Sequence, residues 1–105
     1  MNVLEAMQAM TSRFNPAKAR GVNATVQIMA AGDGGGDYVV QIKDGAATLT
    51  EGVIENPNVT VNVAAKDWID MLSGELDPTM AFMGGKLRIT GDLGLMMRFQ
   101  QIFMS

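Results

Sequence analysis

Asp67 and Asp70 are the acidic pair whose spacing comes closest to that of a catalytic site. Residues three apart lie on one face of a helix, where two carboxylates could share acid–base work. Asp67 also falls in the first turn of the helix expected here, where the helix dipole favours a negative charge. That structural explanation is the stronger one, and no third group converges with the pair to suggest an enzyme.

Two glycine-rich segments resemble ligand-binding loops but lack the residues that such loops need. Residues 33–37 read Asp-Gly-Gly-Gly-Asp, without the further carboxylates and the terminal Glu of a calcium loop. Residues 84–86 read Gly-Gly-Lys, without the spacing of a phosphate loop or the Ser or Thr that follows its lysine. We therefore expect a solvated hairpin loop and a helix end at these places, with no metal site and no cofactor.

The composition excludes several classes of function. The chain of 105 residues has no Cys and no His, so disulfides, thiolate chemistry and imidazole ligands are ruled out. Its net charge is −3 and its eight basic residues are scattered, whereas a nucleic-acid-binding face shows a basic cluster. No signal peptide is recognisable, nor is an apolar run of about 20 residues that could span a membrane. We expect one cytoplasmic domain over residues 1–105, without stable membrane insertion.

Methionine is the residue type that stands out, with ten in the chain. Its flexible, polarisable side chain fills irregular spaces. Those of the last third either complete an ordinary core or line an adaptable cavity for an apolar ligand. They are Met71, Met80, Met83, Met96, Met97 and Met104.

The last predicted helix, at about 93–104, favours the cavity. Its polar stripe is narrow, and apolar residues fill most of the remaining circumference. They are Leu93, Leu95, Met96, Met97, Phe99, Ile102, Phe103 and Met104. A helix that is apolar nearly all round must be covered on more than one face. In a chain this small, a ligand could provide part of that cover.

Hydrophobic periodicity predicts the elements that would position these residues. Alternation predicts strands at residues 22–30, 38–42, 46–51, 59–63 and 86–90. In the first of them Gln27 falls on the face opposite the buried one. Period-3.6 patterns and breakers predict helices at residues 2–14, around Trp68 up to Gly74, at 78–83 and at 93–104. Asp77 and Asp92 are the expected N-caps of the last two helices. Short hairpins favour a mostly antiparallel sheet, hence an α+β fold.

Residues 85–96 read Gly-Lys-Leu-Arg-Ile-Thr-Gly-Asp-Leu-Gly-Leu-Met, and this segment closely resembles the signature of the sterol carrier protein 2 family of non-specific lipid-transfer domains. Residues 38–45, 58–63 and 67–78 are similar to the family's upstream strands and its helix–glycine–proline segment, in order and spacing. The resemblance covers essentially the whole chain. One departure is Ala64-Ala65, where the family often has a Ser or Thr cap. The end at Ser105, without a peroxisomal tripeptide, suggests a stand-alone prokaryotic-type member.

The resemblance implies a five-stranded, mostly antiparallel sheet covered on one face by helices, with a hydrophobic tunnel between them. Family members bind fatty acids, fatty acyl-CoAs, sterols or other apolar molecules and are not themselves enzymes. The tunnel is expected to be lined by Trp68, Leu72, Phe82, Met83, Leu87, Ile89, Met96, Phe99, Gln100 and Phe103. Met80 and Leu95 are further candidates. Gln100, Gln101 and Arg98 are the candidates for contact with a ligand head group.

Three functions follow from these observations, in decreasing order of support. The first is binding, and transfer or presentation, of lipid ligands. The second is a non-catalytic accessory module of a lipid-metabolising enzyme, with a closed core and an exposed apolar patch. The third is a small carboxylate enzyme, which would need a carboxylate of raised pKa in a pocket. The apolar last helix leaves both a monomer and a homodimer open.

Overall fold

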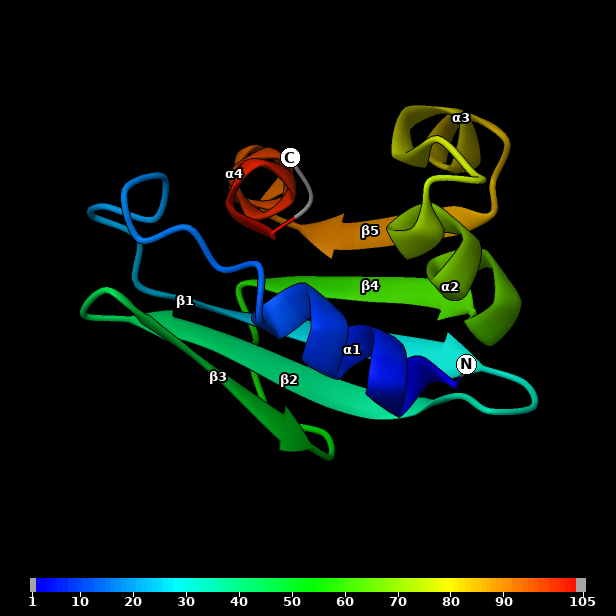
Figure 1. Ribbon diagram of the computed structural model, residues 1–105, viewed down its shortest axis with the longest axis horizontal. Coiled ribbons are helices and arrows are strands. Elements are labelled where there is room, and N and C mark those ends of the chain that lie inside the picture. The colour runs from blue at the N-terminus through cyan, green and yellow to red at the C-terminus, as the bar shows by residue number, and fades with distance from the viewer. Residues whose placement is uncertain (1, 104–105) are drawn as a thin grey trace.

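The computed structural model describes residues 2–103 and has an α+β fold. Four helices and five strands follow one another along the chain (Figure 1). They are α1 (Val3–Thr11), β1 (Ala24–Ala31), β2 (Gly36–Lys43), β3 (Ala46–Glu51), β4 (Val59–Ala64), α2 (Ala65–Ser73), α3 (Pro78–Met83), β5 (Leu87–Gly91) and α4 (Leu93–Phe103). All the predicted elements are present, although α1 is shorter than the predicted 2–14. Met104 lies outside the described residues.

The strands form one sheet in the order β3-β2-β1-β4-β5. Antiparallel pairing joins β1 to β2, β2 to β3 and β4 to β5. This confirms the mostly antiparallel sheet. The pair β1–β4 is parallel, which the hairpin argument did not anticipate. It arises because the hairpin of β2 and β3 intervenes in the chain, and residues 52–58 then cross back to the far side of β1.

One face of the sheet carries the core. Val40, Val26 and Val59 are aligned across β2, β1 and β4, and all three are fully buried. The helices α1, α2 and α4 pack on this face (Figure 1). Burying these apolar side chains is the main driving force for the layered arrangement.

The opposite face is covered at one place, by the crossing segment 52–58. Gln27 lies on this face as predicted, but it is only 2% exposed, so the expectation that only one face of the strand is buried does not hold here. Its Nε2 donates to the carbonyl oxygens of Tyr38 (3.0 Å) and Gly52 (2.9 Å), and its Oε1 accepts from the N–H of Ile54 (2.9 Å). A buried amide is tolerated only when its polar atoms are paired in this way. Gln27 therefore attaches the crossing segment to the sheet.

The helix ends follow the predicted capping residues. Asp77 accepts from the N–H of Met80 at 3.0 Å, and Asp92 accepts from the N–H of Leu95 at 3.0 Å. Both N-caps are thus confirmed. Ala64 makes no side-chain cap for α2, as the departure from the family pattern implied. Gly91, just before α4, has a φ of 114°, and a Cβ there would collide with the carbonyl oxygen of Asn58.

Candidate ligand-binding site

An apolar hollow of about 300 Å³ lies among α2, α3, β5 and α4. Its lining is Trp68, Met71, Pro78, Thr79, Phe82, Leu87, Ile89, Leu93, Met96, Met97 and Gln100. We call this cavity the apolar hollow. Only Thr79 and Gln100 contribute polar side chains, so the site suits the apolar part of a ligand.

Strand β5 forms one wall of the apolar hollow. Leu87 and Ile89 are two residues apart and so point to the same face of the sheet. They pair with Val63 and Val61 of β4, which are buried on the core face. The wall is therefore a direct continuation of the core, and its position depends on the register between β4 and β5.

Trp68 forms a second part of the lining, and a contact with α1 holds its ring in place. Its ring is 1% exposed, and its indole N–H donates to the sulfur of Met7 on α1 at 3.2 Å. A buried indole N–H needs a partner, and here the partner belongs to another helix. The contact fixes the ring against α1.

The rim of the apolar hollow is open to solvent. Phe82 is 45% exposed, Leu93 50% and Met97 65%. These three lie on α3 and on the first two turns of α4. Contiguous apolar groups at a rim mark a binding surface more often than scattered ones do. A ligand that continued past the hollow would cover them.

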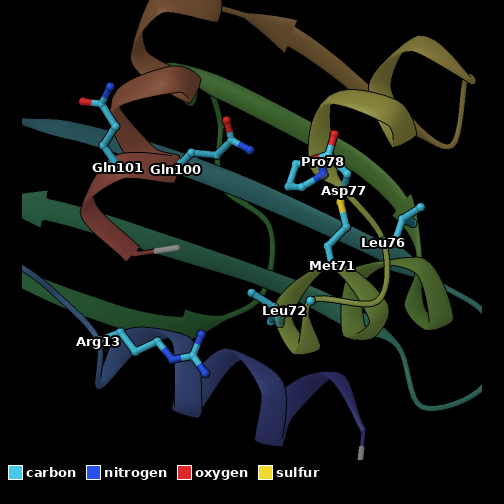
Figure 2. Close-up of a pocket in the computed structure, with 9 residues that line it drawn as sticks. Arg13, Met71, Leu72, Leu76, Asp77, Pro78, Gln100 and Gln101 are labelled. Carbon is cyan, nitrogen blue, oxygen red and sulfur yellow. The ribbon is translucent and has the colours of Figure 1, made fainter. Parts of the chain in front are cut away.

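A second hollow, of about 430 Å³, adjoins the first (Figure 2). Its lining is Arg13, Met71, Leu72, Gly74, Leu76, Asp77, Pro78, Gln100 and Gln101. We call this cavity the polar hollow. Met71, Pro78 and Gln100 line both hollows. An amphiphile could therefore occupy both at once.

Most of the predicted site residues meet in these two hollows. Trp68, Phe82, Leu87, Ile89, Met96 and Gln100 line the apolar hollow, and Leu72 lines the polar one. Whether they bind a ligand stays a prediction.

Three predicted residues line neither hollow. Phe99 and Phe103 are 0% and 1% exposed, and their rings pack together with centroids 4.7 Å apart. They belong to the closed core because their side of α4 faces the sheet and Phe14. Met83 is 78% exposed at the end of α3 and lines neither hollow. The candidate additions Met80 and Leu95 also lie outside the lining.

The head-group candidates are separated by the structure. Gln100 and Gln101 line the polar hollow. Arg98 lines neither hollow, because its guanidinium donates to the carbonyl oxygens of Lys18 (3.1 Å) and Arg20 (3.2 Å). It fastens the loop after α1 to α4 instead.

The sequence analysis missed several lining residues. They are Arg13, Gly74, Leu76, Asp77, Pro78, Thr79 and Leu93, while Met71 and Met97 were named only among the methionines that could line a cavity and were left off the expected tunnel. Leu93 and Met97 are four residues apart on one helix face and lie beside Met96, which was among the expected tunnel residues. This spacing could have identified them. Arg13 had no such signal, since it lies two residues beyond the end of α1 and reaches the site only through the packing of the fold.

The described residues hold no evidence of other chemistry. Between residues 2 and 103, no three acidic side chains gather as a metal ion would require. Asp67 lies in the first turn of α2, and neither it nor Asp70 lines a hollow. No helix in this range is both long enough and apolar enough to cross a bilayer.

Comparisons with known proteins agree with this geometry. Residues 4–104 match the model of the SCP-2 sterol transfer family. The chain is 30% identical over 99 residues to hydroxysteroid dehydrogenase-like protein 2 of Xenopus tropicalis, covering 93% of this chain. The fold is similar to that of palmitated SCP2L2 from Aedes aegypti, with a TM-score of 0.81, 23% identity, and coverage of 100% of this chain and 96% of that one.

Two of the similar proteins are much longer than this chain. The chain spans 24% of the length of the Xenopus tropicalis relative. A double mutant of the sec-alkyl sulfatase PisA1 from Pseudomonas sp. contains the fold with a TM-score of 0.87 and 20% identity. All of this chain matches 17% of that enzyme.

Proposed function

The chain belongs to the SCP-2 sterol transfer family, and we propose that it binds a linear, long-chain lipid in the apolar hollow. The observation that carries this proposal is the hollow itself: about 300 Å³ with an apolar lining and an apolar, solvent-exposed rim. The palmitate that the Aedes aegypti protein carries supports a fatty acyl chain as the ligand class. We propose that the domain supplies binding, since among residues 2–103 the acidic pair Asp67 and Asp70 lines neither hollow.

The size of the hollow sets the expected affinity. A liquid volume of about 30 Å³ per water-sized group gives room for about ten methylenes. Their burial would contribute about 8 kcal/mol gross, at about 0.8 kcal/mol each. Ordering of the chain and of the rim side chains reduces that sum. Contact with the exposed rim adds to it, so we expect a Kd of about 1–10 μM.

Adjacent residues on α3 provide a matched test. Phe82→Asp places a charge in the lining of the apolar hollow. Met83→Asp places the same charge on the next residue, whose side chain lines neither hollow. We expect Phe82→Asp to weaken binding of a fluorescent fatty acid by about tenfold or more, since burying an unpaired charge is costly. Met83→Asp should bind within about twofold of the wild type. Both positions are exposed, so both proteins should fold.

Fluorescence titration of delipidated protein gives the answer. Equal affinities of the two variants would show that the ligand does not occupy the apolar hollow. The absence of saturable binding by folded wild-type protein would contradict lipid binding altogether. Phe99→Asp is unsuitable for this purpose, because Phe99 is fully buried in the core and the charge would unfold the protein.

A second function is favoured by the lengths of the similar proteins. A module that matches 24% of a dehydrogenase-like protein and 17% of an alkyl sulfatase can serve a lipid-metabolising enzyme as a non-catalytic accessory part. We infer that this chain can do the same for an enzyme partner. If the folded protein takes up no lipid, yet raises the turnover of a lipid-metabolising enzyme added to it, the accessory function would be supported and lipid binding would not.

A further inference from the structure

We propose that the polar hollow binds the carboxylate of a free fatty acid, and that Arg13 is the residue that recognises it. The inference rests on the proposed function, because it requires the acyl chain to occupy the apolar hollow. It goes further by assigning the two ends of the ligand to two sites. It also names a specificity residue that lies far in the sequence from the rest of the site.

The contact between the two hollows carries the first step. Met71, Pro78 and Gln100 line both of them, so the two hollows adjoin at these residues, and a ligand that filled both would cross here. Figure 2 shows the Gln100 carboxamide extending toward Pro78 at this junction, while Arg13, just after the end of α1, lines the same hollow. The ligand head would thus pass an amide before it reached a cation.

The charge of Arg13 carries the second step. Within residues 2–103, no hydrogen bond or ion pair holds its guanidinium. Arg98, by contrast, is committed to two backbone carbonyls. A guanidinium presents a planar fork of donors that matches a carboxylate in bidentate geometry. Arg13 is therefore the cation of this site that is available to an anionic head.

Asp77 limits the charge of that head. Its carboxylate lines the same hollow and already accepts from the N–H of Met80 at 3.0 Å. A head with several negative charges, such as a phosphate or the coenzyme A portion of a thioester, would be repelled by it. A singly charged carboxylate can bind Arg13 on one side and remain apart from Asp77. The combination favours the free acid over its phosphorylated or thioester relatives.

The test compares two ligands of equal chain length on three proteins. Dodecanoate and dodecanol, below their aggregation limits, displace the neutral dye Nile red from wild type, from Arg13→Gln and from the control Arg88→Gln. Arg88 is an exposed arginine of β5 that lines neither of the two hollows. Dodecanol reports the apolar hollow alone, and the difference between the ligands reports the head group.

We expect wild type and Arg88→Gln to prefer dodecanoate by roughly fivefold, since the pair is partly exposed and screened by water. Arg13→Gln should lose that preference and keep its affinity for dodecanol. The preference of the wild type should also shrink as NaCl is raised from 20 to 500 mM.

Two outcomes would overturn the inference while leaving lipid binding intact. One is equal affinity of the wild type for the acid and the alcohol. The other is a preference for the acid that survives in Arg13→Gln. If neither ligand nor the dye binds to folded wild-type protein, the proposed function and this inference fail together.

Discussion

At the scale of single residues, Gln27 shows how one polar side chain can hold the connection between β3 and β4 against the sheet. It is buried on the face of β1 that faces away from the helices, and its amide makes three hydrogen bonds. Two of them reach Gly52 and Ile54, in the segment that carries the chain from β3 back to β4. The bonds hold that segment against the sheet, and thereby support β4 beside β1.

Replacing Gln27 by Ala should lower the free energy of unfolding by about 2–3 kcal/mol, because buried carbonyl and N–H groups lose their partners. Gln41→Ala is the matched control. Gln41 lies on β2 on the same face of the sheet, but it is exposed. We expect its replacement to cost less than about 0.5 kcal/mol. Urea denaturation of both variants measures the difference, and equal midpoints would show that the Gln27 amide does not hold the crossing segment.

At the scale of elements, α4 has two halves with different roles. Phe99, Ile102 and Phe103 anchor the second half in the core. The first half presents Leu93 and Met97, both exposed, to the apolar hollow. This division explains the surplus apolar surface of the sequence, because the second half of the helix packs in the core and the first half contributes to the rim of the site.

The start of α4 depends on its N-cap, which gives a prediction at this scale. Asp92→Ala removes the acceptor for the N–H of Leu95 and should cost about 1 kcal/mol of stability. Asp92→Asn keeps an acceptor of similar strength and should stay close to the wild type. Thermal denaturation followed by circular dichroism compares the three proteins. If the Asn variant melts with the Ala variant, charge at the helix start matters more than the capping bond.

At the scale of the whole molecule, the binding site and the core share their walls. Leu87, Met96 and Trp68 line the apolar hollow and are also members of the hydrophobic core. A ligand in the hollow packs against the same side chains that hold β5, α2 and α4 together. Lipid binding should therefore be coupled to the stability of the entire domain.

The coupling predicts a large thermal shift. Fatty acid at a free concentration of 100 times its Kd stabilises the folded state by about 2.7 kcal/mol. For a domain of this size, that corresponds to a rise in Tm of about 10 °C or more. Phe82→Asp, tested at the same ligand concentration, should show a rise of about half as much or less. A wild-type Tm that fatty acid leaves unchanged, despite measured binding, would contradict this coupling, because it would mean that the ligand binds the unfolded chain as well as the folded domain.

The elements and their order could be predicted from the residues alone, because the information for them is local. Alternation gave the five strands, period-3.6 patterns gave the helices, and Asp77 and Asp92 marked where the last two helices begin. The residues around Gly91 also carried the family resemblance, which the match over residues 4–104 bears out.

Which apolar residues face the site and which fill the core depends on how the elements pack against one another. Periodicity cannot separate Phe99 from Met96, since both lie on the apolar part of α4, yet only Met96 lines a hollow. The parallel pairing of β4 with β1, the burial of Gln27 and the arrival of Arg13 beside Gln100 all join residues far apart in the chain. Such contacts depend on how whole elements pack, and no local pattern in the sequence encodes them.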